Sequence, residues 1–304
     1  MPDRIKGALL TATGGICWGL SGSMGQYLFS VEHMDSRWLV PIRLFLAGVL
    51  MLLYGAVKFK KEIFKPWTNR KDAFLLLLYG IPGVALCQFL YFLCIQLSSA
   101  GVGTILQDVS PIIILVTSCL LAKRKPHGYE IICIALGIGG VVLVATHGNL
   151  TELAIPVTSL LAGCGSAFCI MIYNELGGPL LSKYSIVYIQ GWSFCLGGII
   201  TGLVFQFWKI PYSPTGMGYV GIAFVVIVGN ILAFTTYMTG VHLIGPESGI
   251  LYGFSEPVTA AFIGCTLLGS SFTGWDALGF ILIFAMMVLI SIGPKLQAKE
   301  KEKK

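Results

Sequence analysis

The chain has 304 residues, of which 56% are apolar and only 11% are charged, with 20 basic and 14 acidic side chains. An average soluble chain carries about 25% charged residues, because charge is needed to cover a wet surface. This shortage of charge, together with a mean hydropathy of +0.83, excludes a disordered chain, a coiled coil and an ordinary soluble globule. The sequence therefore predicts an all-α integral membrane protein.

Ten apolar runs, bounded by Lys, Arg, Pro or Gly, are each long enough to cross a bilayer as a helix of about 20 residues. They cover residues 7–29, 37–57, 72–96, 101–121, 128–146, 156–176, 184–207, 216–242, 247–268 and 275–293. No small-residue cleavage site follows the first run, so it is expected to be a retained helix and not a signal peptide. The ten runs leave no room for a folded soluble domain.

Basic residues fall almost entirely on one side of these predicted spans. With alternating crossings, 17 of the 20 lie on one side, near the N-terminus and at 58–71, 123–125, 183 and 295–304. Arg37 and Lys209 fall on the other side, and Arg43 lies inside the second span. Because Lys and Arg are retained on the cytoplasmic side, both termini are predicted to be cytoplasmic, in the plasma or inner membrane. Membrane orientation also explains the net charge of +6, so nucleic acid is not expected as a partner.

An internal repeat appears when the sequence is shifted by 146 residues, which superposes 91–144 on 237–290. The aligned identities include Tyr91 with Tyr237, Gly103 with Gly249, Pro111 with Pro257 and Cys119 with Cys265. The basic loop 123–125 aligns with the uncharged loop 269–271, as expected if the second half is upside down. Five spans per half therefore predict a five-plus-five inverted repeat, an arrangement that secondary transporters use for alternating access.

The predicted domains are the halves 1–147 and 156–293 and a basic cytoplasmic tail, 294–304. The nine cysteines all lie in apolar runs, and no two have Cys-x-x-Cys spacing. Neither a metal nor a cofactor is therefore expected. The expected partners are a small-molecule substrate and the lipid bilayer, and association into a homodimer is left open.

Several short motifs occur in a recognisable order along the spans. They are Cys17-Trp18-Gly19, Arg43-Leu44-Phe45, Tyr91, Ser110-Pro111, the stretch 137–144 and Glu256-Pro257. In these motifs the chain resembles the EamA-type branch of the drug/metabolite transporter superfamily over nearly its whole length. The resemblance implies a central cavity lined by the first, third, fourth, sixth, eighth and ninth spans, with the fifth and tenth peripheral. The chain departs from the family pattern at Arg124 and Ser270, where members often carry an acid, and at Phe168, near the expected place of a second tryptophan.

Two carboxylates inside the spans are the main site candidates. An ionisable group at the centre of a span costs about 2.5–3.5 kcal/mol, so each is expected to face a partner or a wet cavity. Glu256 lies near the predicted midplane, directly before Pro257, and Asp108 lies three residues before Pro111. Both prolines are predicted helix breaks, because proline removes a backbone hydrogen bond. Either carboxylate could hold a proton or a substrate ammonium group.

Less specific explanations exist for the same charged residues. Glu256 could belong to a structural bend, with its carboxylate satisfied by neighbouring helices. Asp108 could form a salt bridge with Arg43, the only basic residue within a span. We expect Arg43 to anchor or pair rather than to contact a ligand. The sequence leaves these alternatives open.

Uncharged residues complete the candidate cavity. They are Trp18, Ser21, Gln88, Tyr173, Asn230, Tyr237 and Tyr252. Trp18 and Ser21 share one helical face with two glycines, a small and polar stripe that lipid does not favour. For each aromatic residue the alternative is ordinary packing in the core.

These features predict a secondary, ATP-independent transporter of a small amine-bearing or zwitterionic metabolite, such as an amino acid. Proton coupling and export are compatible with the sequence, as is facilitated transport. Alternative cargoes are quaternary amines and phosphorylated or nucleotide-sugar compounds, although a polyanion calls for several basic residues in the spans. An intramembrane enzyme and a channel-like bundle are the other classes considered. No nucleophile-and-base motif supports the enzyme, which is not expected.

Overall fold

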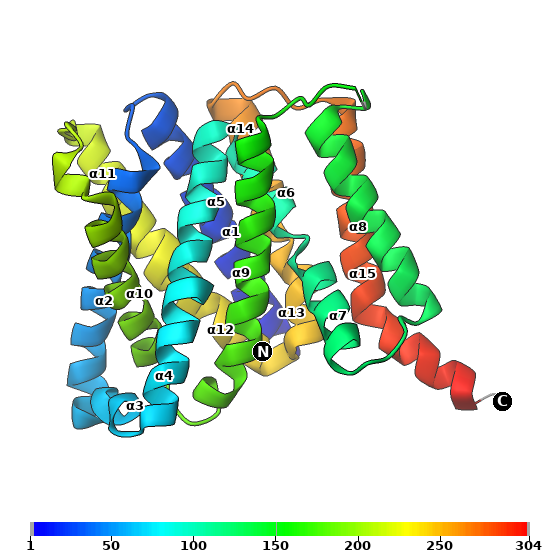
Figure 1. Ribbon diagram of the computed structural model, residues 1–304, viewed down its shortest axis with the longest axis horizontal. Coiled ribbons are helices and arrows are strands. Elements are labelled where there is room, and N and C mark those ends of the chain that lie inside the picture. Colours follow the sequence, from blue (N-terminus) through cyan, green and yellow to red (C-terminus); the bar gives the residue numbers. More distant parts are fainter. Residues whose placement is uncertain (1–2, 150, 303–304) are drawn as a thin grey trace.

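The computed structural model describes residues 3–149 and 151–302 and contains, within them, helices and no strand. The helices pack side by side as a bundle (Figure 1). α1 (Asp3–Ser30) begins and α15 (Gly274–Glu302) ends toward the lower end of the bundle in Figure 1, called here the terminal end. The predicted all-α class is confirmed.

Each half of the chain contains five long helical segments, some of them interrupted. The first half consists of α1, α2 (Ser36–Phe59), η1 (Lys60–Phe64), α3 (Lys65–Thr68), α4 (Arg70–Leu78), η2 (Tyr79–Ala85), α5 (Leu86–Leu97), α6 (Ala100–Gln107), α7 (Ser110–Leu121) and α8 (Gly128–Thr146). The second half consists of α9 (Val157–Leu181), α10 (Ile186–Phe205), η3 (Phe207–Lys209), α11 (Gly216–Phe224), η4 (Val225–Leu232), α12 (Ala233–Ile244), α13 (Pro246–Gly253), α14 (Ser255–Leu267) and α15. The segments η2 and η4 are π-helical and continue the helices on either side of them.

Nine helical stretches of the described residues are long and apolar enough to cross a membrane. They are 36–68, 70–97, 100–121, 128–146, 157–181, 186–205, 216–244, 248–267 and 274–294. α1 has 28 residues, which is also sufficient length. Its glycines and its terminal charges make it less apolar than the other nine. Large apolar side chains such as Leu53, Leu121 and Leu203 are exposed on the outside of the bundle, as expected for helices that contact lipid.

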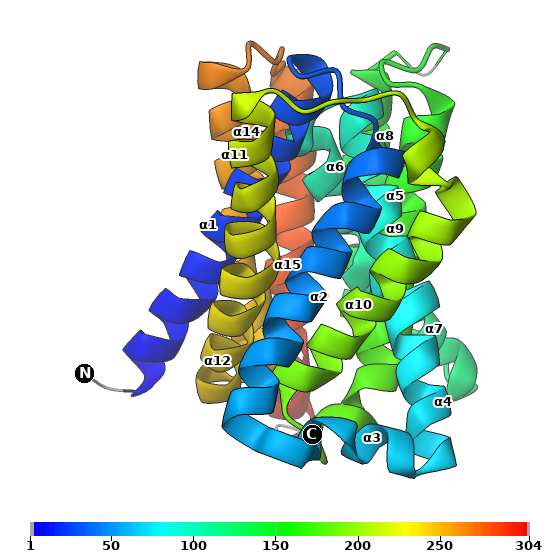
Figure 2. The same ribbon diagram turned by 90° about the vertical axis from the view of Figure 1, so that its left-hand side faces the viewer.

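The 146-residue repeat is visible in the helix boundaries. At this offset η2 corresponds to η4, α6 to α13, and α7 to α14. Corresponding helices run in opposite directions (Figures 1 and 2). The α4–α5 segment rises where α11–α12 descends, and α6–α7 descends where α13–α14 rises. The fold is thus built from two inverted halves. The last membrane-capable stretch ends at Pro294, and α15 continues beyond it to Glu302 through the predicted tail, 294–304, whose final two residues lie outside the described part.

Both halves interrupt their fourth segment near its middle. α6 ends at Gln107 and α7 begins at Ser110, while α13 ends at Gly253 and α14 begins at Ser255. Proline cannot donate a backbone hydrogen bond and clashes with the preceding turn, and Pro111 and Pro257 each lie in the first turn after the interruption. Each interruption therefore places the start of a new helix, with the positive end of its dipole, inside the bundle.

Glycines allow α2 and α10 to pack with their backbones in contact. A Cβ at Gly198 would lie 2.5 Å from the backbone nitrogen of Phe45, and one at Gly48 would overlap the backbone of Cys195. Because a backbone cannot move aside, both positions require glycine for this close approach. The nine cysteines are all free, and most are buried.

Candidate functional site

The bundle contains a cavity of about 530 Å³ that extends from the interrupted helices to the terminal end. Sites for small molecules commonly have volumes of about 300–1,000 Å³. Its polar wall includes Trp18, Ser21, Arg43, Gln88, Tyr91, Gln107, Asp108, Ser110, Tyr173, Tyr237 and Glu256. Arg124 and Glu130 lie at its far end, where α7 connects to α8 at the lower edge of Figure 1.

Asp108 and Glu256 face this one cavity, each from an interrupted helix. Glu256 lies in the first turn of α14 and accepts a hydrogen bond of 3.2 Å from the Tyr91 hydroxyl. Asp108 caps the end of α6, and its buried Oδ2 has no hydrogen-bond partner in the described structure. The ion pairs among the described residues include neither carboxylate. The salt bridge considered between Asp108 and Arg43 is therefore not formed, and the site can accept a cation or a proton.

Arg43 is 2% exposed and lines the same cavity from α2. Its Nη2 donates a hydrogen bond of 2.5 Å to Gln88 Oε1, and its guanidinium carbon lies 3.7 Å from the centre of the Phe92 ring. Its Nε and Nη1 have no hydrogen-bond partner in the described structure. From the sequence, Arg43 was expected to anchor the helix or to pair with an acid. In the structure it is a buried cation that forms no ion pair with a carboxylate.

Aromatic side chains form another wall of the cavity. The Trp18 ring lies 5.0 Å from that of Phe234 and 4.8 Å from that of Tyr237, between ring centres. Tyr173 faces the cavity from α9 and contacts Tyr79 edge to face, at 6.2 Å. These rings pack against one another, so the core-packing alternative holds for them in part. Their cavity faces remain available to an organic ligand.

Two candidate residues are not brought to the cavity wall. Asn230 lies in η4 and is fully buried, and neither its amide nitrogen nor its amide oxygen has a hydrogen-bond partner in the described structure. Tyr252 is 43% exposed at the surface of α13. Residue type alone does not show which way a side chain on a helix points.

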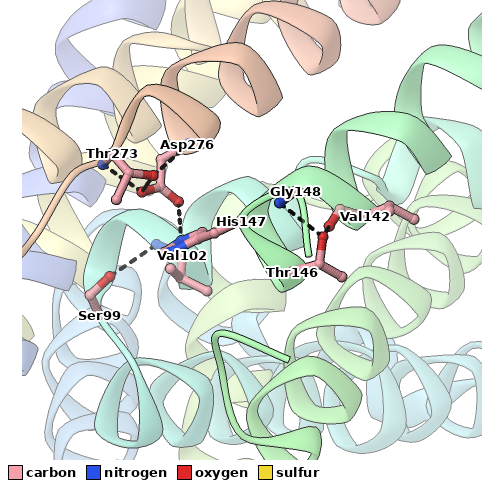
Figure 3. A network of polar contacts seen from close by, with 8 residues as sticks. All are labelled: Ser99, Val102, Val142, Thr146, His147, Gly148, Thr273 and Asp276. Carbon is pink, nitrogen blue, oxygen red and sulfur yellow. Dashed lines mark hydrogen bonds and ion pairs between the residues drawn. The ribbon is translucent and has the colours of Figure 1, made fainter. Parts of the chain in front are cut away.

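A smaller cavity of about 220 Å³ lies at the end opposite the termini. Beside it, His147 Nε2 lies 3.0 Å from Asp276 Oδ1 (Figure 3). Asp276 Oδ2 accepts hydrogen bonds from the backbone and hydroxyl of Thr273, at 2.7 and 2.8 Å. This network joins the end of α8 to the start of α15. The two residues are 129 positions apart in the sequence, so no local pattern indicates this contact.

The comparisons with known proteins agree with this architecture. The sequence profile of the EamA-like transporter family matches residues 5–146 and again residues 157–292. The chain belongs to the EamA-like transporter family. Its resemblance to this family, inferred from the motifs, is confirmed.

Relatives of this EamA-like protein are named as transporters. The uncharacterized inner membrane transporter YicL of Salmonella typhimurium is 32% identical over 98% of this chain and 99% of its own. The uncharacterized inner membrane transporter YedA of Escherichia coli is 24% identical over 88% of this chain and 85% of its own. A solved crystal structure, 16% identical, matches the fold with a TM-score of 0.65 over 97% of this chain and 98% of that chain.

The family, the relatives and the membrane-capable helices show that this EamA-like chain is a multi-pass transporter of the plasma or inner membrane, and they indicate a transport protein rather than an enzyme. The expectation for the cavity wall needs a correction. The second span contributes Arg43, and the fifth and tenth contribute Glu130, Met287 and Ile290. The fifth and tenth spans contribute because the cavity extends to the terminal end, where α8 and α15 approach it, and Arg43 reaches it beside Gln88.

Proposed function

We propose that this protein is a secondary transporter of a small amine-bearing or zwitterionic metabolite, such as an amino acid. One observation carries the proposal. Asp108 and Glu256 enter one cavity from the two interrupted helices, and no Lys or Arg of the described residues forms an ion pair with them. A buried carboxylate is stabilised by a positive partner, and a substrate ammonium group supplies one.

The proposal includes ten membrane crossings, with α1 as the first, and both termini in the cytoplasm. The 17 basic residues on the terminal side support this orientation. The opposite directions of corresponding helices support the inverted arrangement (Figure 2), and the two separate family matches support the division into repeats. In this orientation the large cavity opens toward the cytoplasm.

Contacts at the end opposite the termini support alternating access. Gln26 of α1 accepts a hydrogen bond of 2.8 Å from the backbone N–H of Ala100 and donates one of 2.7 Å to Ser270. Three segments are thereby held together at the end opposite the termini, and none of these three residues lines the large cavity. Transport requires these contacts to separate while the other end closes. Rocking of the two halves about the cavity accomplishes both movements.

Two cargo alternatives are distinguished by the lining of the cavity. The cluster of Trp18, Phe234 and Tyr237 near a carboxylate also suits a quaternary amine, because cations bind to aromatic faces. A phosphorylated cargo is disfavoured, since the basic residues lining the cavity are Arg43 and Arg124, and Arg124 already pairs with Glu130 at 2.7 Å.

The proposal is tested by counterflow in proteoliposomes with a panel of amino acids, amines, quaternary amines and sugar phosphates, at several proton gradients. Glu256→Gln and Asp108→Asn should each lower transport of the preferred compound at least about tenfold, because each removes a partner of the ammonium group. If transport is proton-coupled, its dependence on the proton gradient should disappear in at least one variant.

Glu175→Gln is the matched control. Glu175 is an exposed carboxylate on α9, outside the cavity lining. This variant should transport like the wild type. The proposal is wrong if Glu256→Gln and Asp108→Asn both transport normally with unchanged pH dependence, or if sugar phosphates alone are transported.

A further inference from the structure

We infer that Arg43 binds the carboxylate group of the substrate, so that the cargo is a zwitterion such as an α-amino acid and not a simple or quaternary amine. The inference rests on the proposed function and specifies the substrate class for the same cavity. It assigns a ligand-binding role to a residue that the sequence alone presents as an anchor.

The state of the Arg43 side chain is the first observation. A guanidinium carries a permanent charge and five N–H donors. Here it is 2% exposed, one donor is used by Gln88, and Nε and Nη1 have no partner in the described structure. The Phe92 ring stacks on one face but supplies no hydrogen-bond acceptor. A buried cation left in this state is unfavourable, and an anionic ligand group satisfies it.

The second observation is how α5 arranges the opposite charges. Gln88, Tyr91 and Phe92 lie on one face of this helix, at the spacing that places residues above one another. Gln88 and Phe92 hold Arg43, whereas Tyr91 holds Glu256. Positions 88 and 91 are separated by about 4.5 Å along a helix axis. The cation and the carboxylate are therefore held near each other but apart, each by its own neighbour on α5.

A zwitterion matches this arrangement better than the other cargo classes. An α-amino acid carries its ammonium and carboxylate groups on the same carbon, so one molecule can meet Glu256 or Asp108 at one end and Arg43 at the other. A simple amine or a quaternary amine leaves the guanidinium unsatisfied. A phosphate ester meets one unpaired cation and two carboxylates, which repel it.

The test uses matched sets of compounds that share a side chain and an amine and differ in the carboxylate, which is present, replaced by an amide or absent. One set is L-leucine, L-leucinamide and isoamylamine, and a second is L-phenylalanine, L-phenylalaninamide and phenethylamine. Counterflow and ligand-induced shifts in thermal unfolding are measured with purified full-length protein. For at least one side chain, the wild type should prefer the amino acid over its amide and its amine by at least about tenfold, since both lack the carboxylate.

Three variants assign the preference to Arg43. Arg43→Gln should remove the preference, because it should lower binding and transport of the amino acid at least about tenfold. Binding and transport of the amine should change little. Arg43→Lys keeps the charge and should restore part of the preference. Arg37→Gln is the matched control, because Arg37 is an exposed arginine outside the cavity whose partner is Asp35. It should behave as the wild type.

The inference and the proposed function fail in different ways. If amines are transported as well as amino acids by the wild type, and Glu256→Gln or Asp108→Asn abolishes their transport, the proposed function stands and the role of Arg43 is wrong. Equal loss of amine and amino acid in Arg43→Gln also overturns the inference, because it indicates a structural role. If Arg43→Gln does not fold, the inference is judged by the wild type alone: it stands if the amino acid is preferred over its amide and fails if the two are equal. Absence of transport or binding for every compound overturns both proposals.

Discussion

The interrupted helices of the two halves have the same backbone plan and different chemistry. Asp108 follows α6 at the first interruption, and at the 146-residue offset Phe254 follows α13 at the second. Asp108 lines the large cavity, whereas Phe254 is buried and packs against Phe284 in a tilted arrangement, with 4.7 Å between ring centres. The repeat therefore determines where the helices break. The side chain at each break determines whether that break faces a cavity or packs in an apolar core.

The helices α8 and α15 show the same relation at their first turns. Glu130 and Asp276 occupy matching positions, and each carboxylate accepts a backbone hydrogen bond from the residue three positions earlier, at 2.7 Å. Glu130 pairs with Arg124 through two hydrogen bonds, of 2.7 and 2.8 Å. The residue matching Arg124 is Ser270, and Asp276 instead meets His147 of the other half. The two inverted halves therefore share the capping hydrogen bond, but the carboxylate that makes it has a different basic partner in each half.

The strongest test of this comparison moves a carboxylate to the second break. Phe254→Asp should destabilise the fold by about 3–5 kcal/mol or more, because it removes a large apolar side chain and buries a charge in its place. Folded protein after purification and thermal unfolding in detergent measure the effect. Phe254→Leu is the control and should cost much less. A melting temperature close to wild type for Phe254→Asp would show that this break tolerates polarity as the first one does.

A second test compares glycines on α1 and on its counterpart α9. A Cβ at Gly19 would lie 2.5 Å from the carbonyl oxygen of Glu256 and 2.7 Å from Thr259 Cβ, whereas one at Gly165 would meet only the end of the Leu90 side chain, at 3.0 Å. Gly19→Ala should therefore lose about 1–3 kcal/mol and lower transport by displacing Glu256. Gly165→Ala should change stability by less than about 0.5 kcal/mol. Equal tolerance at both positions would contradict the packing of α1 on α14.

A third test compares the two caps. Glu130→Gln should lower the melting temperature more than Asp276→Asn, because Arg124 carries a permanent charge and His147 is charged only when protonated. Hydrogen bonding to Glu130 raises the pKa of Arg124 above its usual value. The contribution of Arg124 is therefore present throughout the range below that usual pKa and is lost only above it. The effect of Glu130→Gln should be equal at pH 6 and pH 9, and a marked difference between the two would contradict the assignment.

The smallest effect is expected from an exposed ion pair. Glu62 and Lys65 lie 2.7 Å apart, but both side chains are more than half exposed. Water already solvates these charges, so pairing them adds little. Glu62→Gln should leave the melting temperature and transport unchanged. A shift as large as that of Glu130→Gln would mean that burial is not what separates these pairs.

Much of the fold could be predicted from the sequence because membrane crossing leaves strong local signals. Long apolar runs bounded by charges mark the spans, and the asymmetry of Lys and Arg predicts their orientation. The matching of Pro111 with Pro257 located both helix breaks. The π-helical turns η2 and η4 were not predicted, since only η2 contains a proline and neither has a distinctive pattern. Such turns depend on packing against neighbouring helices.

The candidate site was predicted less completely. Five of the candidates are charged, polar or aromatic residues at positions where lipid does not favour them, and all five line the cavity: Asp108, Glu256, Trp18, Gln88 and Tyr237. The same criterion also selected Tyr252, which is exposed, and Asn230, which is buried away from the cavity lining. Chemical type shows that a residue is unusual in a membrane. It does not show whether the side chain of that residue points into the cavity.

By itself, the sequence determined that this protein is a helical membrane transporter with a repeat of 146 residues, because apolar length, charge asymmetry and internal similarity are all properties of the chain read in order. Only the tertiary structure decided which residues meet. Arg43 and Gln88 are 45 positions apart, and Tyr91 and Glu256 are 165 positions apart. The first contact depends on how helices pack within one half and the second on how the two halves pack together, which no local pattern records.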